Sequence, residues 1–358
     1  MKARYLPIAV AVLGSLPGLA LAESYAVREQ SRLDVEARGI GSLRVENPRG
    51  WIQVGPSRDG RIHLTALKLV RSRSTRQAHE FSRETSVETS TEAGQFVVHV
   101  RYPQRRRVYA SLGQLFRGEL DLPRVEVRLA LEVPARLPLR LESSSGDLET
   151  TGLTGSQTLV TTSGEVEVRD AGGGLLVTTT SGGVVARGFG PTAVRSVSGD
   201  VTLEDARGPL DVRTTSGTIE VRGAADSLRL STASGDIRVE QAPRGLSAGS
   251  SSGEIVVDGF AAGGVYLHSA SGDVRLGLGR GVRRAEVRTG SGDISARLAD
   301  GVGFSLDLES RSGTLDTSIP LRVGAVTRQR MSGAVRGGGP QVILRSLSGD
   351  ITVTGGGR

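Results

Sequence analysis

The sequence predicts an all-β fold: a parallel β-solenoid with coils of about 18 residues, preceded by an N-terminal β-rich cap. The main observation is a tripeptide, Ser-Gly-acidic or a near variant, that occurs twelve times from residue 145 onward, with steps of 16 to 21 residues. A fixed period of this length is typical of solenoids, in which each repeat buries its apolar face against its neighbours. The tripeptides begin at Ser145, Ser163, Ser181, Ser198, Ser216, Ser234, Ser252, Ser271, Ser291, Ser312, Ser332 and Ser348.

The second observation is apolar alternation on both sides of each repeat serine. Apolar residues stand three and five places after it, as at Ile219 and Val221, and six and four places before it, as at Leu210 and Val212. A period of two is that of a strand. Each coil is therefore expected to contain two short strands that run parallel to the equivalent strands of the coils beside it.

The glycine of each tripeptide is expected at a sharp corner where the backbone needs positive φ, which glycine adopts without strain. The acidic residue beside it is expected to accept a hydrogen bond from a backbone N–H in the same turn. The predicted corner glycines are Gly146, Gly164, Gly199, Gly217, Gly235, Gly253, Gly272, Gly292 and Gly349.

A Ser or Thr also stands two places before each repeat serine, and only Arg330 interrupts this series. The position is in phase with the inward apolar residues, so these hydroxyls are expected to stack inside the coil or at its rim and to satisfy one another along the axis.

The first 22 residues are typical of a secretory signal peptide: Lys2 and Arg4, a mostly apolar stretch over residues 6–19, and cleavage predicted after Ala22. No later stretch is apolar for long enough to form a transmembrane helix, so no membrane anchor is expected after cleavage. The expected location is the periplasm, the cell surface or the extracellular space of a bacterium. The chain has no cysteine, which excludes disulfides and thiolate chemistry.

Residues 23–135 are assigned to the cap and residues 136–358 to the solenoid. The cap region contains 19 basic and 14 acidic residues, whereas the solenoid region has 24 of each. Within the cap, the stretch from Asn47 to Val54 resembles a degenerate repeat corner. The positive excess predicts weak binding to an anionic envelope surface or acidic polysaccharide, and export argues against nucleic acid. The candidate residues are Arg101, Arg105, Arg106, Arg107 and Arg117.

No catalytic, metal-binding or cofactor-binding residues are predicted. Residues 245–249 match G-x-S-x-G around Ser247, but that motif needs a strand, a strained turn and a helix, and here it falls in a repeat strand. The acidic corner residues form a row that is interrupted at four repeats and lacks the nonapeptide pattern of calcium solenoids. The four histidines show no metal-ligand spacing.

The signal peptide, the corner at Gly50 and Trp51, Val133 and Pro134 before the repeats, and the serial Ser-Gly-Asp motifs together resemble a bacterial β-strand-repeat family. Its members are known as putative adhesins of unknown function, related to adhesin head domains. The resemblance covers nearly all of residues 24–358 and implies a β-helical protein of the cell envelope. It supplies no catalytic residue.

The function predicted from the sequence is that of a non-enzymatic, exported scaffold or adhesin-like binding protein. Two alternatives remain open at this point. One is a β-helix enzyme that acts on polysaccharide, which needs paired acids on one face. The other is a self-associating filament formed by end-to-end stacking of coils, which a cap would oppose.

Overall fold

The computed structural model describes residues 10–11, 27–72, 75–103, 124–241 and 244–355, and the chain divides into two compact units, residues 1–167 and 168–358. The described part consists almost entirely of strands, with one helix, α1 (Thr75–Glu84). None of its helices is long and apolar enough to span a membrane. The all-β prediction is confirmed, and most strands stack in parallel, as in a β-solenoid.

Unit 2, residues 168–358, contains two sets of short strands. The leading strands, which precede a Ser-Gly corner, are β13 (Leu175–Thr178), β15 (Thr192–Arg195), β17 (Leu210–Arg213), β19 (Leu228–Ser231), β21 (Gly245–Ser250), the second halves of β22 (Ile255–Ser269) and β23 (Val274–Thr289), β25 (Phe304–Ser310) and β29 (Gln341–Ser346). The trailing strands, which follow a corner, are β14 (Val184–Arg187), β16 (Val201–Glu204), β18 (Ile219–Arg222), β20 (Ile237–Glu240), the first halves of β22 and β23, β24 (Ile294–Leu298), β26 (Leu315–Thr317) and β30 (Ile351–Gly355).

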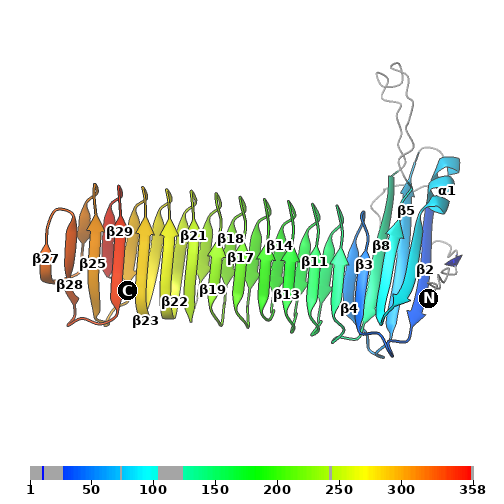
Figure 1. Ribbon diagram of the computed structural model, residues 1–358, viewed down its shortest axis with the longest axis horizontal. Helices are drawn as coiled ribbons and strands as arrows, with labels where there is room; N and C mark the ends of the chain where they lie inside the picture. Colours follow the sequence, from blue (N-terminus) through cyan, green and yellow to red (C-terminus); the bar gives the residue numbers. More distant parts are fainter. Residues whose placement is uncertain (1–9, 12–26, 73–74, 104–123, 242–243, 356–358) are drawn as a thin grey trace, which may run out of the picture. The chain divides into compact units, whose positions relative to one another are not determined.

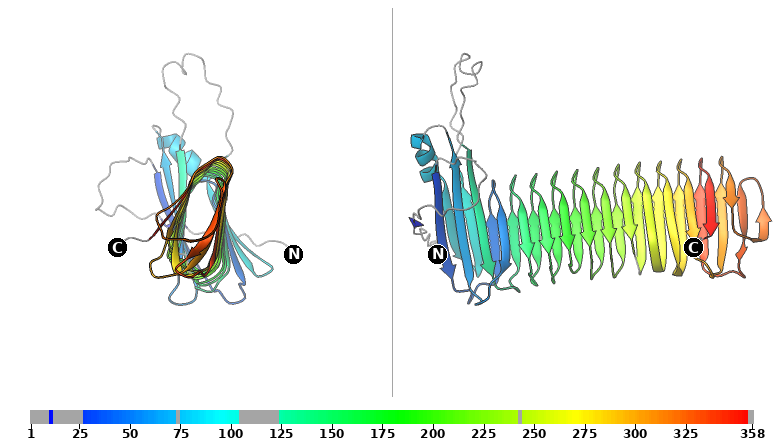
Figure 2. Two further views of the ribbon diagram at one scale, coloured as in Figure 1. Left: turned by 90° about the vertical axis from the view of Figure 1, so that its left-hand side faces the viewer. Right: turned by 180° about the vertical axis from the view of Figure 1, so that it is seen from behind.

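Strands of the same set pair in parallel with matched register. Leu210 pairs with Leu228, which pairs with Leu246, and Ile219 pairs with Ile237. The strands of unit 2 lie side by side in Figure 1, and seen from the end in Figure 2 they superpose in a flattened outline. The inward apolar side chains are buried, as the 0% exposure of Val212 and Ile219 shows. These stacked apolar residues form the core between the two strand sets.

The corner glycines lie where the sequence predicts a turn, but the reason given for them is wrong. None of the nine has positive φ. Instead, a Cβ added to Gly235 would overlap the backbone carbonyl of Gly217 in the coil before it. A Cβ added to Gly217 would likewise overlap the carbonyl of Gly199. Glycine is required because successive corners stack with their backbones in contact, where even a methyl group has no room.

The acidic corner residue also acts differently from the prediction. The carboxylate of Asp236 accepts a hydrogen bond of 2.9 Å from the backbone N–H of Glu254, the equivalent position one coil later. Asp200 receives the N–H of Thr218 at 2.8 Å in the same way. The carboxylate therefore joins neighbouring coils and does not cap its own turn.

The column of Ser and Thr residues is buried, as predicted, but its hydrogen bonds are to backbone. In each described corner the side-chain oxygen accepts the N–H of the corner glycine three residues later, for example from Gly235 to Thr232 at 3.0 Å. Some hydroxyls also donate to the preceding glycine carbonyl, as Ser250 does to Gly235 at 3.2 Å. The column thus fixes the shape of each corner and joins it to the next.

Positive φ is found at the opposite turn, directly after the trailing strands β14, β16, β18 and β20 and the first half of β22. Glycine and longer polar residues alternate there: Gly188, Asp205, Gly223, Gln241 and Gly259 have φ between 57° and 65°. A Cβ at Gly223 would lie 2.8 Å from the carboxylate of Asp205, so the short residue makes room for the longer side chain one coil before it.

The last coils do not follow chain order, which corrects the expectation of regular stacking. β29 pairs in parallel with β23 and β25, and β30 pairs with β24 and β26, so the C-terminal residues fill a position that the chain had skipped. The antiparallel strands β28 (Arg330–Val335) and β27 (Arg322–Val326) follow on the other edge of β25. The predicted corner at Ser332 is wrong, because this residue lies inside β28.

Unit 1, residues 1–167, contains parallel stacks that end in antiparallel strands. The paired strands of one series are, in order, β2 (Val27–Val35), β5 (Ile62–Arg71), β8 (Arg124–Val133), β4 (Ile52–Pro56) and β10 (Leu148–Thr151). Strand β1 (Val10–Ala11) pairs with β2 and falls inside the predicted signal peptide. The other runs β6 (Ser86–Glu92), β7 (Gln95–Arg101), β3 (Ser42–Glu46), β9 (Leu139–Glu142) and β11 (Gln157–Val160). Strand β12 (Val166–Arg169) lies at the division between the units.

Unit 1 contains a corner that the sequence predicts, and a helix. A Cβ on Gly146 would overlap the carbonyl of Gly50, so Gly50 occupies a corner position as predicted for Asn47–Val54. Helix α1 packs Ala78 and Phe81 against Val27, Val70 and Val125, at the antiparallel end of the stack.

Candidate functional site

The basic residues proposed from the sequence fall mostly outside the described part of the chain. Arg105, Arg106, Arg107 and Arg117 lie in the undescribed range 104–123. Arg101 is the exposed last residue of β7, and its guanidinium lies 3.5 Å from the carboxylate of Glu88. The structure therefore places one of the five residues, in a surface ion pair.

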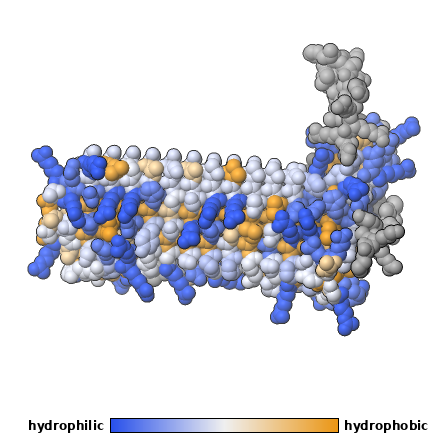
Figure 3. Space-filling view, in the orientation of Figure 1, coloured by the Kyte–Doolittle hydropathy of each residue, from blue (hydrophilic) through white to orange (hydrophobic). Residues whose placement is uncertain are grey.

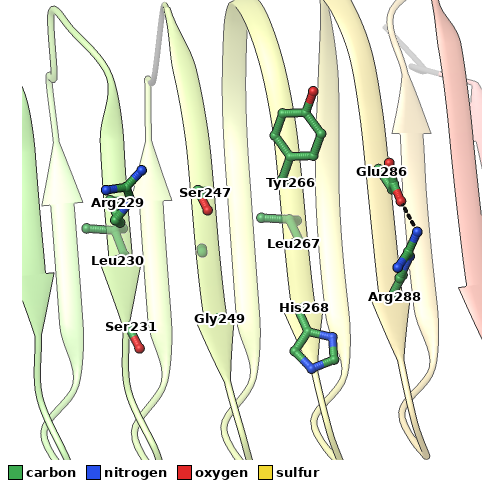
Figure 4. A pocket seen from close by; sticks show the side chains of 11 residues that line it. Arg229, Leu230, Ser231, Ser247, Gly249, Tyr266, Leu267, His268, Glu286 and Arg288 are labelled. Carbon is green, nitrogen blue, oxygen red and sulfur yellow. Dashed lines mark hydrogen bonds and ion pairs between the residues drawn. The ribbon is translucent and has the colours of Figure 1, made fainter.

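A hollow of about 380 Å³ lies on the outer face of the leading strands in unit 2. Figure 4 shows its walls: β19 on one side, β22 and β23 on the other, and β21 between them. The residues that define it are Arg229, Ser231, Ser247, Gly249, Tyr266, His268, Glu286 and Arg288.

The hollow forms because β21 has small residues at its outward positions. Parallel pairing aligns Ser247 with Arg229 on one side and with Tyr266 on the other. The next outward position of β21 is Gly249, which lies beside His268. Short side chains on β21 beside longer ones leave a depression, and the residue Tyr266 at its edge is 49% exposed.

Several polar groups of the hollow are available to a ligand. The side chains of Arg229, Ser247 and His268 have no hydrogen-bond or ion-pair partner among the described residues, whereas Glu286 is bound by the guanidiniums of Arg284 and Arg288. The lining contains two guanidiniums and one carboxylate, and thus a local positive excess. An exposed aromatic ring across the hollow from an unpaired guanidinium suits a ligand with both apolar faces and anionic groups.

The hollow lacks the arrangement that hydrolysis of a glycosidic bond needs. Glu286 is its one carboxylate in the described lining, and glycosidases use two. Ser247, from the G-x-S-x-G match, lies in the middle of β21 and not at a strand–turn–helix junction. The surrounding surface is mixed, since Figure 3 shows hydrophilic side chains beside small apolar patches over the strands of unit 2.

Unit 1 has a second, more polar groove of about 590 Å³, lined in part by Arg32, Gln53, His63 and Glu132. His63 lies between two carboxylates: Nδ1 is 2.6 Å from Asp34, and Nε2 is 3.0 Å from Asp59. Carboxylates only accept hydrogen bonds, so both ring nitrogens donate and the imidazolium form is favoured.

The hydrogen bond to Asp34, and to a smaller extent the one to Asp59, raises the pKa of His63 above its usual value. The pKa of Asp59 is lowered by the backbone N–H of Arg61 and by His63. Because the two carboxylates bind opposite nitrogens, they do not converge on one ion, and the described residues contain no group of three or more His, Asp or Glu side chains suited to a metal.

The sequence alone does not bring Tyr266 and His268 together with Arg229. The signal that could have found the hollow is register: when the repeats are aligned, Ser247 is a small outward residue between Arg229 and Tyr266, and Gly249 is another beside His268. The cluster of Asp34, His63 and Asp59 left a weaker signal, because Asp34 is 29 residues from His63 in the chain.

Comparisons with known proteins place part of the chain in a family. A search of the curated proteins found no match. Among solved structures, a putative lipid binding protein from Parabacteroides distasonis is similar, with 10% identity and a TM-score of 0.33, over 92% of this chain and 97% of that one. A putative adhesin from Bacteroides fragilis has 11% identity and a TM-score of 0.24, over 91% of this chain and 96% of that one. A putative cell adhesion protein from Clostridium sporogenes has 8% identity and a TM-score of 0.21, over 92% and 100%.

The family model that matches is that of Toastrack DUF4097, over residues 194–354. This range lies inside unit 2 and includes every residue that lines the hollow. The resemblance read from the repeats is confirmed for this part of the chain. Residues 194–354 therefore form a Toastrack DUF4097 domain.

Proposed function

We propose that this protein is a non-enzymatic scaffold, exported to the bacterial cell envelope, that binds an acidic polysaccharide in the hollow over β21. The observation that supports this most is the unpaired guanidinium of Arg229 across the small residues Ser247 and Gly249 from the exposed ring of Tyr266. A volume of about 380 Å³ is sufficient for one or two sugar units.

The chemistry of the lining fits such a ligand. A guanidinium binds a carboxylate with two parallel hydrogen bonds. Of the two arginines in the described lining, Arg288 is paired with Glu286, whereas Arg229 has no ion-pair partner among the described residues. The ring face of Tyr266 offers apolar surface to the C–H face of a sugar, while Ser247 and His268 offer hydrogen bonds to hydroxyl groups.

The scaffold part of the proposal rests on the backbone of the coils. Stacked corners are joined by carboxylate-to-N–H and hydroxyl-to-carbonyl bonds, so the outer face is held in a regular, rigid array. We assign coils of about 18 residues to this array, since Leu210, Leu228 and Leu246 align. We assign the antiparallel strands of unit 1 to a cap that covers open strand edges.

A binding role is favoured over the polysaccharide-acting enzyme by Glu286. Two guanidiniums already pair with this carboxylate, and the described lining holds no second carboxylate beside it, whereas hydrolysis of a glycosidic bond uses two. The protein is therefore also incubated with the acidic polysaccharide, and new reducing ends are measured. Their formation would favour the enzyme alternative.

The main test is calorimetric titration of the full chain with oligogalacturonate, and with a neutral maltooligosaccharide of equal length. We expect binding to the acidic oligomer that weakens about tenfold or more in Arg229→Ser and in Tyr266→Ala. The matched control is Arg195→Ser, an exposed arginine on β15 outside the hollow, which should bind like the unaltered protein. Equal binding by all variants, or equal affinity for both oligomers, would contradict the proposal.

A further inference from the structure

The C-terminal residues occupy a place between two coils that precede them in the chain. β29 contacts β23 on one edge and β25 on the other, while β30 lies between β24 and β26. Figure 1 shows β29 between β23 and β25. The segment 341–355 thus completes a stack whose flanking coils, residues 274–298 and 304–317, are made by earlier parts of the chain.

Both sides of this segment have the same contacts as an internal coil. Toward the earlier side, the N–H of Asp350 donates to Asp293 at 2.8 Å and the hydroxyl of Ser346 donates to the carbonyl of Gly292 at 3.2 Å. Toward the later side, Asp350 accepts the N–H of Thr314 at 2.7 Å, and Ser310 donates to Gly349 at 2.8 Å. The slot therefore holds the segment on two faces through the contacts that join any internal coil to its neighbours.

An empty slot would be costly. Val342, Leu344, Ile351 and Val353 are all fully buried in it. Their removal would leave four strand edges of the flanking coils unpaired and would expose the apolar core between them. The slot is stable only when a segment with this pattern fills it.

The connection that leads into the segment is short and tightly placed. Residues 336–340 cross from β28 to β29, which lie on opposite edges of β25. Arg336, Gly337 and Gly338 have φ of 48°, 87° and 88°. A Cβ on Gly339 would overlap the carbonyl of Gly303, so the crossing has no spare room. Arg336 is the one non-glycine residue of this short connection with a left-handed backbone, and short hinges under strain favour exchange of the segment that follows them.

From these observations we propose that residues 341–355 exchange between two copies of this chain, so that the segment of each copy fills the slot of the other. Every ladder contact named above joins the segment to residues before the hinge, and each is the same when the segment comes from a second copy. In an exchanged pair the hinge at residues 336–340 opens, and each segment is buried in the slot of the other copy as it is in its own.

The consequence for binding rests on the proposed function. An exchanged pair holds two hollows in one particle, and a repeating polysaccharide that reaches both would be bound more tightly than by one copy. The exchange itself does not depend on any ligand, so the experiment below tests it separately.

The test uses engineered cysteines, because the natural chain has none. Ser295 and Thr352 are register partners in β24 and β30. Neighbouring parallel strands bring such positions within the Cα separation that a disulfide needs. Full-length Ser295→Cys and Thr352→Cys variants are mixed, warmed below the unfolding midpoint, cooled and oxidised. The double variant is oxidised alone, and Ser295→Cys mixed with Thr354→Cys serves as an off-register control.

We expect a disulfide-linked dimer in the first mixture, none in the off-register mixture, and linked monomer in the double variant. Deletion of Gly337 and Gly338 should increase the dimer, because a shorter hinge crosses β25 less easily. If the double variant links internally while the mixture forms no more dimer than the off-register control, exchange is contradicted. A double variant that folds but does not link would contradict the inserted position itself.

Discussion

The backbone N–H of Asp350 donates to the carboxylate of Asp293 at 2.8 Å, although 57 residues separate them. The same bond joins sequential coils, as from Asp293 to Asp273 at 2.9 Å. The corner carboxylate therefore acts as a recognition element between coils, whether or not they are adjacent in the chain.

Asn in place of Asp350 should make the free energy of unfolding less dependent on pH in the acidic range. The backbone and side-chain hydrogen bonds from Thr314 lower the pKa of Asp350 below its ordinary 3.8. The charged carboxylate of Asp350 therefore stabilises the folded protein above pH 3.8, and this contribution is lost as the pH falls through the lowered pKa. Asn keeps the acceptor oxygen but does not titrate.

The measurement is the free energy of unfolding of both proteins between about pH 5 and pH 2. The variant should show the shallower decline below pH 3.8. Parallel curves for the two proteins would mean that the bond to Thr314 contributes nothing.

Ala in place of Gly235 should destabilise the protein by about 3 kcal/mol, because its methyl group would overlap the Gly217 carbonyl in a packed stack. The control is Gly174→Ala, where a Cβ meets nothing within 4 Å and φ is not left-handed. Chemical denaturation of both variants checks this. Similar losses at both sites would show that close approach is not what requires glycine at the corner.

The repeat spacing located Gly235 and Asp236 correctly, because a structural period is written directly in the sequence. It did not reveal their contacts, since each lies against a different coil and a spacing only identifies equivalent positions. The order of the last coils was missed for the same reason: Ser348 continues the series of tripeptides, and nothing in that series tells which neighbour the segment joins. Only the steps of 20, 21, 20 and 16 residues near the end indicated a departure.

Asn in place of Asp34 should change the titration of His63. Its raised pKa means that the paired, protonated form stabilises unit 1 fully below about pH 6.5, and that this contribution is lost as the pH rises through the raised folded value. Because Asp59 has a lowered pKa, its carboxylate stays ionised over that range. Proton NMR of the His63 ring should give a lower pKa in Asp34→Asn than in the unaltered protein. An unchanged pKa would exclude the contact with Asp34 in solution.

Ser in place of Arg105, Arg106 and Arg107 should weaken co-sedimentation with vesicles that contain anionic lipid. This follows from the positive excess of residues 23–135, at about 1 kcal/mol for each basic side chain near the surface. Binding should decrease as salt approaches physiological strength. Neutral vesicles are the control, and equal sedimentation of variant and unaltered protein at low salt would remove these arginines as a binding site.

The hollow was less predictable than the fold. Tyr266 and His268 stand two places apart on one strand, as the alternation predicts, but Arg229 comes from two coils earlier. Its partnership with them depends on the parallel register and on the absence of long side chains at Ser247 and Gly249. Pairing between coils, not the pattern within one coil, makes the site.

The most direct test of the central claim is a crystal structure of the full chain with oligogalacturonate. It should show sugar over Ser247, with a carboxylate on the guanidinium of Arg229 and a ring face against Tyr266. Sugar bound in the groove beside His63 instead, or an empty hollow at saturating oligomer, would contradict it.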